Sequence, residues 1–302
     1  MKVVAALAAV LLMSACTGAD DQLRTGGVSS PEPAAPDTPS PTATARPTPT
    51  PLASPPPTAG TYLALGDSLA VGVGATQPDA TGYVALIHRA LVGPEATPRV
   101  GTLTNLAVSG ETSASMIAGG QLAAALNAIA VAQPPVALVS LDIGGNDLLR
   151  LLGTEVCATD PVGAECLQLL ALTLTEFDAN YRQIVTALVE RLATHAPDAR
   201  LAVMTYFNPF SGTDAAYEAA GELALLGADG LVDCAAADPQ ARGMNDIIAC
   251  LAPELGAVPV DIQPRFAGLG LELTHIGSED IHANDAGYAV IAAAFVEALR
   301  QL

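Results

Sequence analysis

Lysine and tryptophan are almost absent from this chain of 302 residues, which has one lysine, Lys2, and no tryptophan. Acidic residues outnumber basic ones, with 31 Asp and Glu against 12 Lys and Arg, and the formal net charge is −19. Nucleic-acid binding and docking to anionic lipid both need clustered positive charge. The composition therefore argues against a nucleic-acid partner and a polybasic membrane contact. A Walker-type phosphate loop is also excluded, because that loop requires a lysine.

No apolar run near the N-terminus is long enough to span a bilayer. Val3–Met13 falls short of the roughly 20 residues that a transmembrane helix needs. Preceded by Lys2 and followed by small residues, this run predicts a signal peptide over residues 1–16. Ser14-Ala15-Cys16 resembles a bacterial lipobox, which implies lipid attachment at Cys16 and a location outside the cytoplasm, anchored to the cell membrane. Ordinary secretion is the alternative.

Residues 17–60 lack hydrophobic periodicity and hold about half of the 23 prolines, so they are expected to form a disordered linker. Residues 61–302 alternate short apolar runs with longer helical patterns. This alternation predicts one α/β domain whose parallel sheet is covered by helices on both faces. The expected strands are Tyr62–Leu65, Thr102–Leu106, Val136–Asp142, Arg200–Tyr206 and Ala257–Asp261. The expected helices are Tyr83–Leu91, Ser113–Ile129, Glu176–Thr194, Ala215–Leu226, Met244–Leu251 and Ala286–Leu302.

Polar and glycine-rich clusters follow the first three expected strands, and another precedes the last helix. They are Gly66-Asp67-Ser68-Leu69, Ser109-Gly110, Gly144-Gly145-Asn146-Asp147 and Glu279-Asp280-Ile281-His282. Each cluster alone is typical of a turn or a helix cap. Ligands of parallel α/β sheets bind outside the carboxyl ends of the strands, where these clusters would converge. Together they predict a functional site at that edge.

The clusters resemble the motifs of the SGNH hydrolases, the GDSL lipase and esterase group, with Ser68, Gly110, Asn146 and His282 in the family's order. The resemblance implies a flavodoxin-like three-layer α/β/α sandwich with about five parallel strands. Ser68 would be the nucleophile and His282 its base. The backbone N–H groups of Ser68 and Gly110 and the side chain of Asn146 would form the oxyanion hole. No cofactor or metal is expected.

The chemistry of these residue types supports the same roles. A serine hydroxyl is a weak nucleophile until an imidazole accepts its proton, and the imidazole then protonates the leaving alcohol. The family usually places an aspartate three residues before its histidine, where this chain has Glu279, with Asp280 two residues before. Both carboxylates are candidates for the third member, with a narrow preference for Glu279.

Without Cys16, four cysteines are left, a number suited to two disulfides in an oxidising compartment. Local pairs, Cys157–Cys166 and Cys234–Cys250, are the simplest of the three possible connectivities. The segments Leu151–Leu172 and Phe207–Pro253, which contain these pairs, are expected to shape an apolar pocket for an acyl group. The apolar residues singled out for this contact are Leu151, Leu152, Phe207, Phe210, Leu225 and Leu226.

The predicted function is a metal-independent serine esterase or lipase that hydrolyses carboxylic esters through an acyl-enzyme, with lipid or lysophospholipid esters favoured. A carbohydrate O-acetylesterase of the same fold is one alternative. A non-catalytic, lipid-anchored solute-binding protein is another. The expected partners are the ester substrate and the membrane, and the protein is expected to be a monomer. A metal centre is not expected, because the chain has only four histidines.

Overall fold

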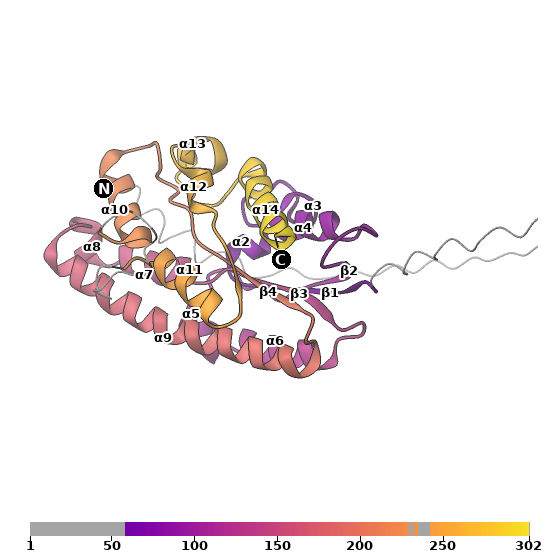
Figure 1. Cartoon of the computed structure of the whole chain (residues 1–302). Helices are drawn as coiled ribbons and strands as arrows, with labels where there is room; N and C mark the ends of the chain where they lie inside the picture. The colour runs from indigo at the N-terminus through magenta and orange to yellow at the C-terminus, as the bar shows by residue number, and fades with distance from the viewer. Residues whose placement is uncertain (1–57, 229, 231, 233, 235–241, 302) are drawn as a thin grey trace, which may run out of the picture.

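The computed structural model describes residues 58–301, apart from 229, 231, 233 and 235–241 (Figure 1). The predicted signal peptide, Cys16 and nearly all of the predicted linker lie outside the described residues. No helix within the described part of the chain is both long and apolar enough to cross a bilayer.

Five parallel strands form the central sheet, in the order β2-β1-β3-β4-β5. All five predicted strands are present, with ends displaced by a few residues. From β1 the chain passes to β2 on one side, and from β2 it crosses back to β3 on the other side of β1. The connections that leave β1 and β2 therefore run in opposite directions, which opens a crevice at the carboxyl end of β1. The strands are β1 Gly60–Leu65, β2 Val100–Asn105, β3 Val136–Leu141, β4 Arg200–Met204 and β5 Val258–Val260.

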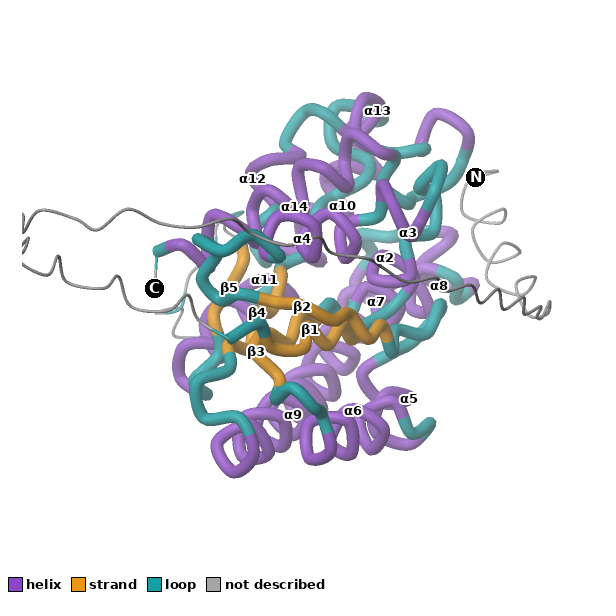
Figure 2. The backbone as a smooth tube through the Cα atoms, turned by 90° about the vertical axis from the view of Figure 1, so that its right-hand side faces the viewer, coloured by secondary structure: helices purple, strands orange, loops and turns teal. Residues whose placement is uncertain are grey.

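Helices cover both faces of this sheet, as the three-layer prediction requires (Figure 2). One face carries α4 (Tyr83–Leu91) and α14 (Asp285–Arg300), and the other carries α6 (Gln121–Val131) and α9 (Ala164–His195). The interior strand β1 is buried along its whole length, which fits a sheet covered on both sides. The remaining elements are α2 Ser68–Val71, α3 Pro78–Thr81, α5 Ser113–Ala118, α7 Gly145–Leu152, α8 Glu155–Thr159, α10 Ala215–Leu226, α11 Met244–Glu254, α12 Gln263–Phe266, α13 Gly270–Leu273 and the 3-10 turn η2 Ile276–Ser278.

Two of the predicted helices differ clearly from the sequence prediction. The expected helix Ser113–Ile129 is divided into α5 and α6 at Gly119 and Gly120, and Gly120 has φ 99°, a left-handed conformation that interrupts a helix. Helix α9 starts at Ala164, well before the predicted Glu176. Its first three turns bury few apolar side chains, so the sequence there lacks the periodicity that marks a helix.

Candidate active site

The turn after β1 presents Ser68 at the carboxyl edge of the sheet. Asp67 caps the short helix α2 by accepting the Leu69 N–H on Oδ1 at 2.9 Å. Gly66 has φ 139°, and a Cβ there would lie 2.3 Å from Oδ1 of Asp142. Only glycine fits this close approach of the turn to β3.

Side chains occupy three of the four successive backbone N–H groups of this turn. The Ser68 N–H is the exception, because within the described part of the chain it has no hydrogen-bond acceptor. A preorganised N–H beside the nucleophile can donate to an oxyanion. The Gly66 N–H donates to Gln121 Oε1 at 2.8 Å, and the Asp67 N–H donates to Asp142 Oδ2 at 3.1 Å. The Leu69 N–H donates to Oδ1 of Asp67.

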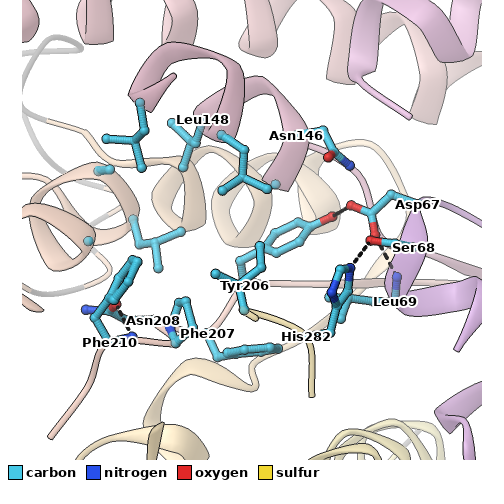
Figure 3. Close-up of a pocket in the computed structure, with 18 residues that line it drawn as sticks. Asp67, Ser68, Leu69, Asn146, Leu148, Tyr206, Phe207, Asn208, Phe210 and His282 are labelled. Carbon is cyan, nitrogen blue, oxygen red and sulfur yellow. Dashed lines mark hydrogen bonds between the residues drawn. The ribbon is translucent and has the colours of Figure 1, made fainter. Parts of the chain in front are cut away.

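His282 lies beside Ser68 although 214 positions separate them in the sequence. Its Nε2 is 2.8 Å from Ser68 Oγ, a contact drawn in Figure 3. Its Nδ1 is 2.6 Å from Oδ1 of Asp280. A carboxylate only accepts, so Nδ1 carries the imidazole proton and Nε2 is left to accept the serine proton. The three side chains thus form a hydrogen-bonded chain from carboxylate to hydroxyl.

The structure brings Asp280, rather than Glu279, to the imidazole, which corrects the narrow preference for Glu279. Oδ1 of Asp280 accepts both Nδ1–H and the backbone N–H of His282, the latter at 3.0 Å, in an Asx-type turn. The hydrogen bond from His282 holds the pKa of Asp280 below its ordinary value. Glu279 is exposed and closes the turn η2 with φ 64°, without a bond to the imidazole.

The two other predicted oxyanion residues lie beyond the carboxyl ends of the strands that flank β1, Gly110 in the loop after β2 and Asn146 after β3. Asn146, at the start of α7, is 3% exposed and lines the same pocket as Ser68 and His282. One of its two amide hydrogens is bonded to the Glu111 carbonyl at 3.0 Å, which leaves the other as a further donor. Gly110 has φ 79° and stands directly before Glu111, so the same bond ties its loop to Asn146. Gly110 is half-buried and does not line the pocket itself.

A buried polar network beneath the turn was not predicted from the sequence. Asp142 is fully buried and accepts two hydrogen bonds. Its Oδ2 accepts the Asp67 N–H, and its Oδ1 accepts the Tyr83 hydroxyl at 2.5 Å. Burial, and then the negative charge of Asp67, raise the pKa of Asp142 well above its ordinary value. Tyr206 donates its hydroxyl to Oδ2 of Asp67 at 2.7 Å. The one available signal was an acidic residue, Asp142, ending an otherwise apolar run.

An apolar pocket opens beside Ser68 and His282 (Figure 3). Four of the residues predicted to shape it do line it, namely Leu152, Phe207, Phe210 and Leu225, whereas Leu151 and Leu226 do not. Leu151 instead packs on the disulfide behind α7. Further apolar lining comes from Leu148, Leu149, Ala224 and Ile281.

Both predicted disulfides, Cys157–Cys166 and Cys234–Cys250, are present. Disulfides persist in oxidising compartments, so they indicate an extracytoplasmic protein. Across the described residues, no group of three or more His, Cys, Asp or Glu side chains is arranged to hold a metal ion.

Comparison with known proteins identifies the family. No curated protein matches the chain. The lipase Lip_vut3 from a goat rumen metagenome shares its fold, with a TM-score of 0.53 at 20% identity over 79% of this chain and 96% of the lipase. The phospholipase A1 from Streptomyces albidoflavus NA297 has a TM-score of 0.50 at 19% identity over 81% of this chain and 99% of that enzyme. The profile of the GDSL-like lipase/acylhydrolase family matches residues 64–290, which include all four motifs. The chain therefore belongs to the GDSL-like lipase/acylhydrolase family of ester hydrolases.

Proposed function

We propose that this protein is a serine esterase that hydrolyses carboxylic esters through an acyl-enzyme. The observation that carries the proposal is the hydrogen-bonded chain Ser68–His282–Asp280 at the mouth of an apolar pocket. Ser68 Oγ attacks the ester carbonyl carbon while its proton passes to Nε2 of His282, which then protonates the leaving alcohol. Water repeats the sequence on the acyl-enzyme, releasing the acid and restoring Ser68. Asp280 orients the imidazole and stabilises its protonated form.

The negative charge that develops on the carbonyl oxygen needs donors fixed in advance. We assign this role to the Ser68 N–H, the Gly110 N–H and the second Nδ2 hydrogen of Asn146. The Ser68 N–H supports this assignment because it is the unoccupied amide of its turn within the described structure. A donor of this kind typically contributes about 10²–10³ in rate.

The pocket supports a substrate with an apolar acyl chain. Its cavity volume is about 100 Å³. A cavity that holds one water molecule needs roughly 10–15 Å³, so this pocket has room for a chain of several carbons beyond an acetyl group. Leucines of α7 and α10 and Phe207 would contact that chain. We therefore favour lipid or lysophospholipid acyl esters.

Hydrolysis of nitrophenyl esters from acetate to palmitate tests this proposal. We expect kcat/KM to rise beyond acetate and Ser68→Ala to abolish both turnover and fluorophosphonate labelling. Ser278→Ala, which alters an exposed serine outside the pocket, is the control. Full turnover in Ser68→Ala would overturn the nucleophile assignment. A preference for acetate together with release of acetate from acetylated xylan would favour the O-acetylesterase. Ester binding without turnover would favour a solute-binding protein.

The N-terminal sequence supports a second proposal, that lipid on Cys16 anchors the enzyme to the membrane. Two acyl chains suffice for stable anchoring without a spanning helix. Growth with an alkyne-tagged fatty acid should label the wild-type protein in the membrane fraction, and Cys16→Ala should abolish the label and release the protein. Unlabelled protein in the medium would instead indicate ordinary secretion.

A further inference from the structure

The phenol of Tyr206, just beyond β4, contacts both the residue that precedes Ser68 and the residue that precedes Asn146. Its hydroxyl donates to Oδ2 of Asp67, the residue before Ser68, at 2.7 Å (Figure 3). The ring of the same side chain packs against the backbone of Gly145, the residue before Asn146. One side chain therefore contacts the immediate neighbours of the proposed nucleophile, through its hydroxyl, and of a proposed oxyanion donor, through its ring.

The surroundings of Tyr206 allow its ring little movement. A Cβ added at Gly145 would lie 2.6 Å from Cε1 of Tyr206, so the ring packs directly on the glycine backbone. The main chain of Tyr206 is held by the fully buried amide of Asn245, whose Oδ1 accepts the Tyr206 N–H at 2.7 Å. Nδ2 of the same amide donates to the Tyr206 carbonyl at 2.8 Å. The phenol is thus held at its backbone, its ring and its hydroxyl.

The hydroxyl also stays protonated, as a donor to Asp67 must. Burial, and then the negative charge of Asp67, raise the pKa of Tyr206 well above its ordinary value. The second oxygen of Asp67 is already occupied by the Leu69 N–H. Asp67 therefore transmits the position of the Tyr206 hydroxyl to the turn that holds Ser68.

We propose that Tyr206 is a positioning residue that fixes the separation between Ser68 and Asn146, and so completes the oxyanion hole. This inference rests on the proposed esterase function. Tyr206 also lines the pocket, so a simpler role as a wall for the acyl chain must be distinguished from it. A positioning role acts on kcat for every ester, whereas a wall acts on KM and depends on chain length.

Tyr206→Phe separates the two roles because it keeps the ring and removes only the hydroxyl. We expect kcat to fall about 10- to 100-fold by the same factor for acetate and octanoate esters, with KM changed less than about twofold. Tyr62→Phe is the matched control, since it removes another buried phenol hydroxyl, 2.8 Å from Ser140 Oγ. Titration with a fluorophosphonate counts competent enzyme, and thermal unfolding compares the two variants, so a loss of folded protein is not mistaken for a loss of rate.

A double-mutant cycle with Asn146→Ala tests the coupling directly. In that background we expect Tyr206→Phe to lower kcat less than about threefold, because the donor that it positions is gone. Independent, multiplicative effects would overturn the inference. So would a kcat equal to that of Tyr62→Phe, or a change confined to KM of long-chain esters. The proposed function fails on a different result, full activity of Ser68→Ala.

Discussion

The carboxylate of Asp280 accepts two hydrogen bonds from His282, one from Nδ1 and one from the backbone N–H. Asp280→Asn would place an amide opposite Nδ1, favouring the tautomer that cannot accept the Ser68 proton. We expect kcat to fall by about 10²–10⁴, as for other triads that lose their carboxylate. Ester hydrolysis measures this, with Glu279→Gln as the control, expected within about twofold of wild type. A larger loss in Glu279→Gln than in Asp280→Asn would reverse the assignment.

Asn146→Ala should lower kcat by about 10²–10³ with a small change in KM, because its amide would act mainly on the transition state. The control is Asn180→Ala, which removes an amide hydrogen bond to Ser113 at 3.1 Å outside the pocket. Steady-state kinetics on one nitrophenyl ester suffice. Equal kcat in the two variants would show that Asn146 serves only to hold the loop after β2 in place, through its hydrogen bond to the Glu111 carbonyl.

Asp142→Asn should stabilise the protein increasingly as pH rises. The pKa of Asp142 is raised in the folded protein by burial and by Asp67, so its contribution to stability is complete below its unfolded pKa of about 3.9 and is lost as pH rises toward the folded value. Asparagine does not titrate. Within that window the folding equilibrium constants of the variant and the wild type should diverge by up to about tenfold per pH unit.

Urea unfolding between about pH 4 and pH 8 measures this divergence for Asp142. Asp142→Leu, which removes the acceptor of the Asp67 N–H, is the contrasting variant and should destabilise the protein throughout. A difference between Asp142→Asn and wild type that stays constant with pH would show that Asp142 is ionised in the folded protein.

Leu152→Trp should shorten the acyl pocket. Leu152 lines the pocket near the end of α7, and a larger ring there fills space that a long chain would occupy. We expect kcat/KM for octanoate to fall more than about tenfold and that for acetate less than about threefold. Leu172→Trp, at a side chain that is 67% exposed and outside the pocket, controls for the added ring. Equal losses on both esters would place the acyl chain elsewhere.

The sequence was sufficient for the five strands, because they depend on local patterns, whereas the pairing of Ser68 with His282 followed from the resemblance to a known family. Strand ends carry short polar motifs, and a parallel sheet brings those ends to one edge. Helix α7 escaped prediction because Gly-Gly-Asn-Asp is typical of a turn, although in the structure the helix begins within it. The choice between Glu279 and Asp280 depended on the left-handed backbone at position 279, which the composition of that segment does not signal.

Tyr206 and Asn245 could not be assigned from the sequence for another reason. Tyr206 lies 139 positions from Asp67, and Asn245 lies 39 positions from Tyr206. A tyrosine at the end of a buried strand is normally a core residue, and an asparagine in the first turn of a helix is unremarkable. Their roles follow from tertiary packing, which one sequence does not encode in any short pattern.

The occupied amides of the Ser68 turn also determine which anions the site can hold. Sulfate or phosphate is usually bound by several converging N–H groups, but here the side chains of Gln121, Asp142 and Asp67 already take three of the four. The turn therefore offers a single oxygen site instead of an anion cradle. An oxygen on a carbon attached to Ser68 can reach it, whereas a free polyvalent anion gains little, so ordinary phosphate buffer should leave this enzyme uninhibited.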